Sequence, residues 1–202
     1  NASMVIGTPN TELLSALKQQ SGSGTETPPT SGTDAEGYFA NNLLKWEYKA
    51  NNNRLMIYPV GTNTKVAIPD FTTTNAAPWS IYSGSITNLI ISYDITGIGN
   101  YAFANMPYLL SVTTGEDVAT IGTGAFYNDI RLGSIVFPEK VTLVEPNAFT
   151  GCSSLYSATK KNVNMVVSTP NTELLRVLGT SSNPDAPNNP GSSGSTITGT
   201  ID

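Results

Sequence analysis

The sequence predicts an α/β repeat fold: a short solenoid of 23-residue coils between an N-terminal β cap and a C-terminal helical cap. Three observations lead to this prediction. Apolar residues recur at a fixed spacing of 23 in the middle of the chain, an aromatic-rich segment without that repeat precedes them, and a helix-like segment follows them. A fixed period of roughly 20–50 residues is typical of stacked repeat architectures.

Three full copies carry the repeat: IGNYAFANMPYLLSV from Ile98, IGTGAFYNDIRLGSI from Ile121 and VEPNAFTGCSSLYSA from Val144. They align without insertions, and a partial copy lies on either side, so we assign residues 86–178 to the coils and their closing helix. Six aligned columns are Ile95/Val118/Val141, Ile98/Ile121/Val144, Ala102/Ala125/Ala148, Phe103/Phe126/Phe149, Leu109/Leu132/Leu155 and Val112/Ile135/Ala158.

The Leu-x-x-Val spacing at this period indicates a leucine-rich-repeat coil. Each Leu-x-x-Val-x supplies a short strand with inward apolar residues, and each Ala-Phe pair packs a short helical turn behind it. No coil can bury its Phe and Leu alone, so the coils must stack. We expect eleven residues to be nearly fully buried: Ile98, Phe103, Leu109, Val112, Ile121, Phe126, Leu132, Ile135, Val144, Phe149 and Leu155.

The same residues resemble the BspA-type (Treponema-type) leucine-rich repeat, whose hallmark is Ile-Gly-x-x-Ala-Phe-x-x-Cys-x-x-Leu. Ile98-Gly99, Ala102-Phe103 and Leu109 fit it, as do the equivalent residues of the next two copies, including Cys152. Glu145 departs from the Gly of the motif, and Met106 and Asp129 depart from its Cys. The resemblance covers residues 86–158 and implies a surface protein that adheres to host proteins, other cells or matrix.

Residues 38–85 precede the repeat and are predicted to form the N-terminal β cap. The run LKWEYKANNNRLMIYPVG indicates two strands, residues 45–49 and 54–58, around an Asn-Asn-Asn turn. The run IPDFTTTNAAPW then leads irregularly to Trp79. The first coil of a solenoid has an apolar end that must be covered, and this segment is expected to cover it.

A longer repeat relates the two ends of the chain. MVIGTPNTELLSAL from Met4 returns as MVVSTPNTELLRVL from Met165, an offset of 161 residues. Thr169 is an N-cap candidate, and Pro170 would take the first helical position. We expect the second copy to be the C-terminal cap. Residues 1–20 hold the first copy, which is either the closing helix of a preceding module or the same motif used twice within one domain.

Two segments have the composition of flexible linkers: residues 21–37 and 179–202. Both consist largely of Gly, Ser, Thr, Pro and Asn, and neither contains enough apolar residues to offset the entropy cost of ordering.

Composition argues against most kinds of chemistry. The chain has no His and one Cys, Cys152, so His-based catalysis, His or Cys metal sites and an internal disulfide are excluded. We expect no enzyme, no catalytic residues, no cofactor and no metal. A column of Asp94, Asp117 and Lys140 beside Glu116 and Glu139 could suggest Ca²⁺, but Lys140 and the lack of calcium-loop spacing favour a solvated turn.

The partners expected from composition are extracellular. With a net charge of −5 and 12% charged residues, the chain lacks the basic surplus that nucleic-acid binding needs, and no apolar run is long enough for membrane insertion. Thr, Ser and Asn make up about a third of the residues, which is typical of secreted or cell-surface proteins. The partner would be an extracellular protein or a glycan. Stacking on six aromatic residues would favour a glycan, although these are more often core: Trp46, Tyr48, Tyr58, Phe71, Trp79 and Tyr82.

The predicted binding face is the concave side of the strands. In Leu-x-x-Val-x the residues between the buried ones point to solvent. These are Asn88, Ser111, Ser134 and Ser157, followed by Ile90, Thr113, Val136 and Thr159. All are uncharged, so binding there would depend weakly on salt. Four strands give a face under ~20 Å wide, too small for a stable single interface.

The function predicted is that of a non-enzymatic cell-surface or secreted binding module for adhesion. The alternative is a structural spacer or stalk in a multi-module surface protein, with binding carried elsewhere. A third possibility within the binding hypothesis places recognition on the cap near Trp46 and Trp79, or on the loops.

Overall fold

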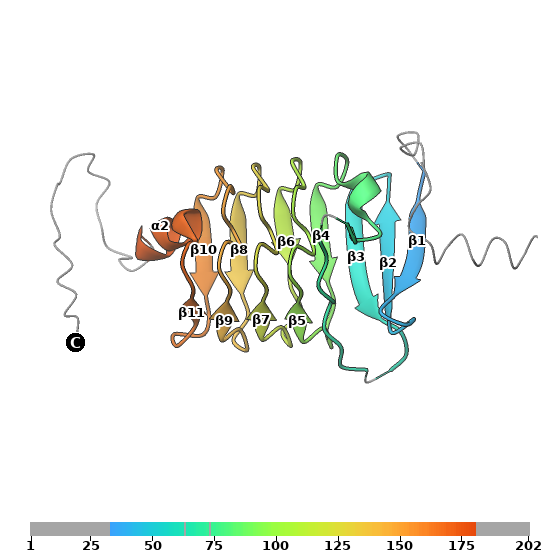
Figure 1. The fold of residues 1–202 in the computed structure, drawn as a ribbon, viewed down its shortest axis with the longest axis horizontal. Coiled ribbons are helices and arrows are strands. Elements are labelled where there is room, and N and C mark those ends of the chain that lie inside the picture. Colours follow the sequence, from blue (N-terminus) through green and yellow to red (C-terminus); the bar gives the residue numbers. More distant parts are fainter. Residues whose placement is uncertain (1–32, 63, 73, 181–202) are drawn as a thin grey trace, which may run out of the picture.

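The computed structural model describes residues 33–62, 64–72 and 74–180, which form an elongated solenoid (Figure 1). Its coils have two strand-bearing sides, each contributing one sheet, and the apolar core lies between them. The strands run across the long axis of the molecule, so that successive coils add to its length. The α/β repeat fold predicted from the sequence is confirmed.

Seven strands form the larger sheet, in the order β1-β2-β3-β4-β6-β8-β10. The first three are β1 (Ala35–Phe39), β2 (Leu44–Lys49) and β3 (Arg54–Pro59), which pair antiparallel. From β3 onward the pairing is parallel, through β4 (Asn88–Ile91), β6 (Ser111–Thr113), β8 (Ser134–Phe137) and β10 (Ser157–Lys160). The cap and the repeats therefore share one sheet without a break.

Four short strands form the second sheet on the other side of the coils, in the order β11-β9-β7-β5. They are β5 (Gly97–Ile98), β7 (Thr120–Ile121), β9 (Leu143–Val144) and β11 (Val166–Val167), all parallel. Between a strand of this sheet and the next strand of the larger sheet, the chain makes the Ala-Phe turn. About three 23-residue coils result, as the period predicted.

The core consists of the repeat columns. All eleven residues expected to be buried are at most 9% exposed. The phenylalanine rings of successive coils stack nearly parallel: Phe103 and Phe126 have ring centroids 5.6 Å apart, and Phe126 and Phe149 are 5.1 Å apart. This aromatic column joins successive coils across the core.

The repeat begins earlier than residue 86, which corrects the sequence prediction. Val66 bridges Ile95, the Ile68 N–H donates to the Gly97 carbonyl at 2.9 Å, and Trp79 stacks on Phe103 at 5.3 Å. Trp79 thus takes the place of a repeat phenylalanine. Residues 64–91 form an additional, longer coil, because a loop between Phe71 and Trp79 interrupts the 23-residue spacing.

The N-terminal cap contains the two predicted strands, with ends within one residue of β2 and β3, and one strand that was not predicted. Strand β1 includes Ala35, Glu36 and Gly37, which the composition had assigned to the linker 21–37. A Cβ atom at Gly37 would lie 2.6 Å from the Trp46 indole nitrogen. The glycine that suggested a linker therefore lets β1 pack over Trp46.

Helix α2 (Thr172–Thr180) closes the C-terminal end of the stack beside β10. Its apolar side buries Leu174 and Val177. The helix starts later than predicted: Asn171 precedes it, since the Leu175 N–H donates to the Asn171 carbonyl at 2.9 Å, and Pro170 lies outside. It also includes the first two residues of the predicted linker 179–202.

The other predictions about the chain ends lie outside the described residues. These concern the first copy of the helix motif in residues 1–20, most of the linker 21–37 and the linker beyond residue 180.

Candidate binding surfaces

The outward side of the larger sheet, here called the sheet face, carries all eight residues of the predicted binding face. Each alternates with a buried residue along its strand. Four are exposed and four are half-buried. The exposed ones are Ser111, Thr113, Val136 and Thr159, and the half-buried ones are Asn88, Ile90, Ser134 and Ser157. The structure therefore brings them together on one surface, and the Ser111 hydroxyl donates to the Asn88 side-chain oxygen at 2.8 Å.

The sheet face continues across the N-terminal cap, which sequence reasoning missed. In β3, Arg54 is paired with Asn88 of β4, and Met56 with Ile90. One strand further, β2 places Lys45 and Glu47 on the same side. The face therefore spans seven strands instead of four. The signal that could have shown this is the alternation of apolar and polar residues in both cap strands, in phase with the repeat strands.

Charges on the cap half of the sheet face neutralise each other. The Lys45 ammonium donates to Glu47 at 2.8 Å and to Glu36 at 3.0 Å. The Tyr58 hydroxyl also donates to Glu47. These contacts lower the pKa of Glu47, chiefly through Lys45, and raise that of Lys45. The ammonium lies over the rings of Tyr38 and Tyr58, each 5.8 Å away. This end of the face is thus aromatic and nearly neutral.

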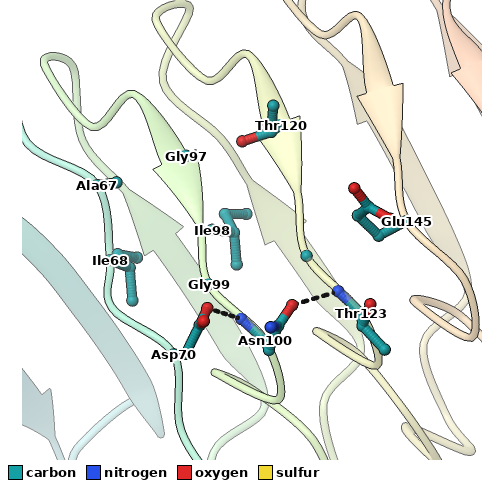
Figure 2. Close-up of a pocket in the computed structure, with 11 residues that line it drawn as sticks. Ala67, Ile68, Asp70, Gly97, Ile98, Gly99, Asn100, Thr120, Thr123 and Glu145 are labelled. Atoms are coloured by element: carbon teal, nitrogen blue, oxygen red, sulfur yellow. Dashed lines mark hydrogen bonds between the residues drawn. The ribbon is translucent and has the colours of Figure 1, made fainter.

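A shallow groove of about 450 Å³ follows the smaller sheet (Figure 2). Side chains link its coils: Asp70 accepts from the Asn100 N–H and Asn100 accepts from the Thr123 N–H, both at 2.7 Å. Its two carboxylates, of Asp70 and Glu145, lie on opposite sides of the close-up and come from coils that are not neighbours. Three strand spacings of ~4.8 Å separate their coils, about 14 Å, which is more than the separation of the two carboxylates in a hydrolytic pair.

The tryptophans proposed for glycan stacking belong to the core. Trp79 is fully buried, with its indole N–H donating to the Ala102 carbonyl at 3.0 Å, and Trp46 is 7% exposed. Tyr48 and Phe71 are also buried. These four side chains therefore have the core role that the sequence analysis favoured over glycan stacking. The sequence analysis also considered binding by the cap surface around Trp46 and Trp79. Because both tryptophans are buried, neither can contribute to such a surface.

The acidic column is an ion-paired turn. Asp117 accepts from Lys140 and, at 3.1 Å, from Lys65, and its other oxygen accepts from the Asp94 N–H at 3.2 Å. These contacts, led by Lys140, lower the pKa of Asp117 to about 2. Within residues 33–62, 64–72 and 74–180, no group of three or more Cys, Asp or Glu side chains is arranged to hold a metal ion.

Cys152 is buried, and its thiol donates to the Phe126 carbonyl at 3.1 Å. Burial raises its pKa well above the usual range of a thiol. A protonated, enclosed thiol is a poor nucleophile, which fits the core role predicted for it. In the described part of the chain, no helix combines the length and the hydropathy needed to cross a membrane.

The family comparison agrees with this architecture. The model of the BspA type leucine rich repeat region matches residues 64–168 in six copies. No curated protein matches the sequence. A solved leucine-rich repeat protein from Eubacterium ventriosum is similar, with 19% identity and a TM-score of 0.47 over 66% of this chain and 45% of that one.

Two further solved structures are similar with a TM-score of 0.33 each. One is a leucine rich cell surface protein from Faecalibacterium prausnitzii (21% identity, 65% of this chain, 44% of that one), and the other is the pneumococcal vaccine antigen PcpA (16%, 67% and 43%). The chain spans less than half the length of all three proteins. The family match covers just over half of the 202 residues and includes the early coil from residue 64. The chain therefore belongs to the BspA-type leucine-rich repeat family.

Proposed function

We propose that the chain is a non-catalytic binding module of a bacterial surface protein and that it binds an extracellular protein through its sheet face. The observation that carries this proposal is the continuity of that face over seven strands. A stiff, solvent-facing sheet presents side chains in fixed positions, which lowers the entropy cost of recognition.

The two halves of the sheet face suit different contacts. On the repeat half, Thr159 is paired with Val136, whose side chain is 50% exposed, and Ser111 and Thr113 are exposed on the neighbouring strand β6. On the cap half, the exposed ring of Tyr38 supplies aromatic area beside the paired charges of Lys45, Glu36 and Glu47. Tyrosine is enriched in protein interfaces, and antibody binding loops combine it with serine. A net-neutral face of this kind gives binding that changes little with ionic strength.

The size of the face limits the affinity of one module. Seven strands at ~4.8 Å spacing span about 29 Å, and four residues along a strand span about 13 Å, which gives a flat area near 400 Å². A stable interface needs about 800 Å² per partner. We therefore propose that one module binds weakly and that several modules acting together provide useful affinity.

The experiment compares two double variants in a binding screen against purified extracellular matrix and serum proteins. Ser111→Arg with Ser134→Arg places two large cations on neighbouring strands of the sheet face. Thr120→Arg with Val166→Arg is the matched control on the smaller sheet, where both residues are exposed. A protein that binds the wild type and the control but loses at least tenfold affinity for the face variant supports the proposal.

Two results would contradict it. Equal binding by both folded variants moves the site off the sheet face. If no protein of the panel binds the wild type in a multivalent display, the module is better explained as a structural spacer.

A further inference from the structure

The Ala-Phe turns of neighbouring coils are joined by an asparagine ladder, formed by Asn105 and Asn128. The Asn105 N–H donates to the Tyr127 carbonyl and the Asn128 N–H to the Thr150 carbonyl, both at 2.8 Å. The Asn128 amide nitrogen also donates to the Asn105 side-chain oxygen at 3.2 Å. Asn105 therefore forms two bonds with the coil that follows it: its N–H donates, and its side-chain oxygen accepts.

The ladder stops at the longer coil of residues 64–91. The residue at the ladder position of that coil, 23 before Asn105, is Tyr82 of the short 3₁₀ helix η1 (Ser80–Tyr82). The Tyr82 N–H donates to the Trp79 carbonyl at 2.9 Å, inside its own turn. Within residues 33–62, 64–72 and 74–180, no hydrogen bond reaches the Ala104 carbonyl, and the Asn105 amide nitrogen donates none. One acceptor and one donor of the ladder are thus left unused.

A cavity of about 450 Å³ lies at these two unused groups, between η1 and the Ala-Phe turn of the next coil. Ala104 and Asn105 both line it. Because Ala104 is the repeat equivalent of Tyr127, its carbonyl is directed toward the preceding coil, as the Tyr127 carbonyl is. The remaining lining includes three large apolar side chains and two hydroxyl groups, those of Phe71, Trp79, Met106, Ser80 and Ser83. Ligand pockets typically have volumes of about 300–1,000 Å³ and combine apolar walls with a few polar groups that fix the orientation of the ligand.

We propose that this cavity binds a loop of a partner protein through an asparagine that is followed by an apolar residue. The partner's asparagine continues the ladder: its N–H donates to the Ala104 carbonyl, and its side-chain oxygen accepts from the Asn105 amide nitrogen. The chain itself provides the model for this occupant, because Asn105 forms both bonds with the next coil and is followed by the buried Met106. No residue of the sheet face lines the cavity, so this site is independent of binding by that face.

Nuclear magnetic resonance of the full chain tests this proposal with a blocked tripeptide, acetyl-Ala-Asn-Met-amide. At about 10 mM the peptide should shift the side-chain amide signals of Asn105 and the backbone amide signals of Ala104 and Met106, since two hydrogen bonds and one apolar side chain give binding in the millimolar range. The control peptide acetyl-Ala-Ala-Met-amide lacks the side-chain oxygen. It should bind at least about fivefold more weakly, the equivalent of one hydrogen bond.

Two variants of the chain locate the site. Asn105→Gly removes the donor and keeps the left-handed backbone at this position, where φ is 61°, because glycine adopts that conformation readily. It should weaken binding of the asparagine peptide by at least about fivefold. Asn128→Gly is the matched control: it makes the same change at the same kind of backbone, one coil away from the cavity, and should bind the peptide like the wild type.

Three results would overturn the proposal: unshifted signals at Asn105, equal binding of the two peptides, or wild-type binding by the folded Asn105→Gly variant. If that variant does not fold, the comparison of the two peptides on the wild type decides. N-acetylglucosamine, whose acetamido group also carries an N–H and a carbonyl, is tested in the same way. Stronger binding of the sugar than of the asparagine peptide overturns the assignment to a protein loop.

Discussion

Phe126→Ala tests whether the aromatic column holds the coils together. Phe126 is fully buried in the middle coil and stacks on both neighbours, with ring centroids 5.6 Å from Phe103 and 5.1 Å from Phe149. Its N–H donates to the Ala148 carbonyl, and alanine preserves that bond. The substitution therefore removes the ring while the backbone contacts stay in place.

Two contributions set the size of the effect. Truncating a buried Phe to Ala costs about 3–5 kcal/mol through lost burial and the cavity that remains. Each stacked aromatic pair adds about 0.5–1.5 kcal/mol, and Phe126 belongs to two such pairs, which places the loss at the upper end, near 5 kcal/mol. A domain of this size is stable by about 5–15 kcal/mol, so the variant should retain little stability.

Urea unfolding and thermal melting, both followed by circular dichroism, measure this loss. For about 150 residues, 5 kcal/mol corresponds to a fall in melting temperature of about 15 °C. Tyr127→Ala is the control, because this neighbouring side chain is 41% exposed, and it should cost less than about 1 kcal/mol. Equal stabilities of wild type and Phe126→Ala would refute the role of the aromatic column.

Three further predictions concern single residues of the coils. Burial raises the pKa of Asp129 well above 3.8, so the folded protein retains a proton that the unfolded chain releases, and the free energy of unfolding falls as the pH rises from about 4. Asp129→Asn keeps an acceptor for the Met106 N–H, and its free energy of unfolding should rise relative to that of the wild type as the pH increases from about 4. Urea titrations at several pH values measure this difference, and an equal pH dependence of the two proteins would contradict the prediction. Cys152 should react with iodoacetamide only at the rate of unfolding, measured by mass spectrometry, and fast labelling of the native protein would disprove its enclosure. Gly122→Ala puts a Cβ 2.8 Å from the Asn100 backbone nitrogen and should cost about 1–3 kcal/mol in urea unfolding, whereas an unchanged midpoint would show that the coils can separate there.

The sequence predicted those parts of the fold in which the period is uninterrupted. Ile98, Phe103 and Leu109 recur every 23 residues, and the structure buries every copy. Trp79 was missed as a member of the aromatic column, because the loop after Phe71 lengthens its coil and a different ring type fills the position. A search for one fixed spacing cannot detect a coil with an insertion.

Only part of the candidate surface could be predicted, because the sequence pattern gives the direction of side chains on a strand but not the neighbours of that strand. The strand alternation placed Ser111 and its equivalents on the outward side, and that placement is seen in the structure. The extension of the face over β3 depends on the pairing of Arg54 with Asn88, which are 34 positions apart. The alternation within β3 indicates which of its side chains point outward, but it does not indicate which strand lies beside it. The role of Asn171 was also hidden, because its side-chain oxygen accepts from the Phe149 N–H only when the last coil lies against it.

The orientation of the strands has a mechanical consequence. The two ends of the described solenoid, β1 and α2, lie at opposite ends of its long axis, and the strands run across that axis (Figure 1). The hydrogen bonds between strands therefore point along the line that joins the two ends. Tension applied through these ends would load the strand pairs one after another, as in unzipping, instead of shearing all of them at once. A surface protein built from such units would lengthen coil by coil under a weak pull. The extra length of each released coil would lower the tension on the remaining stack before the next coil opened.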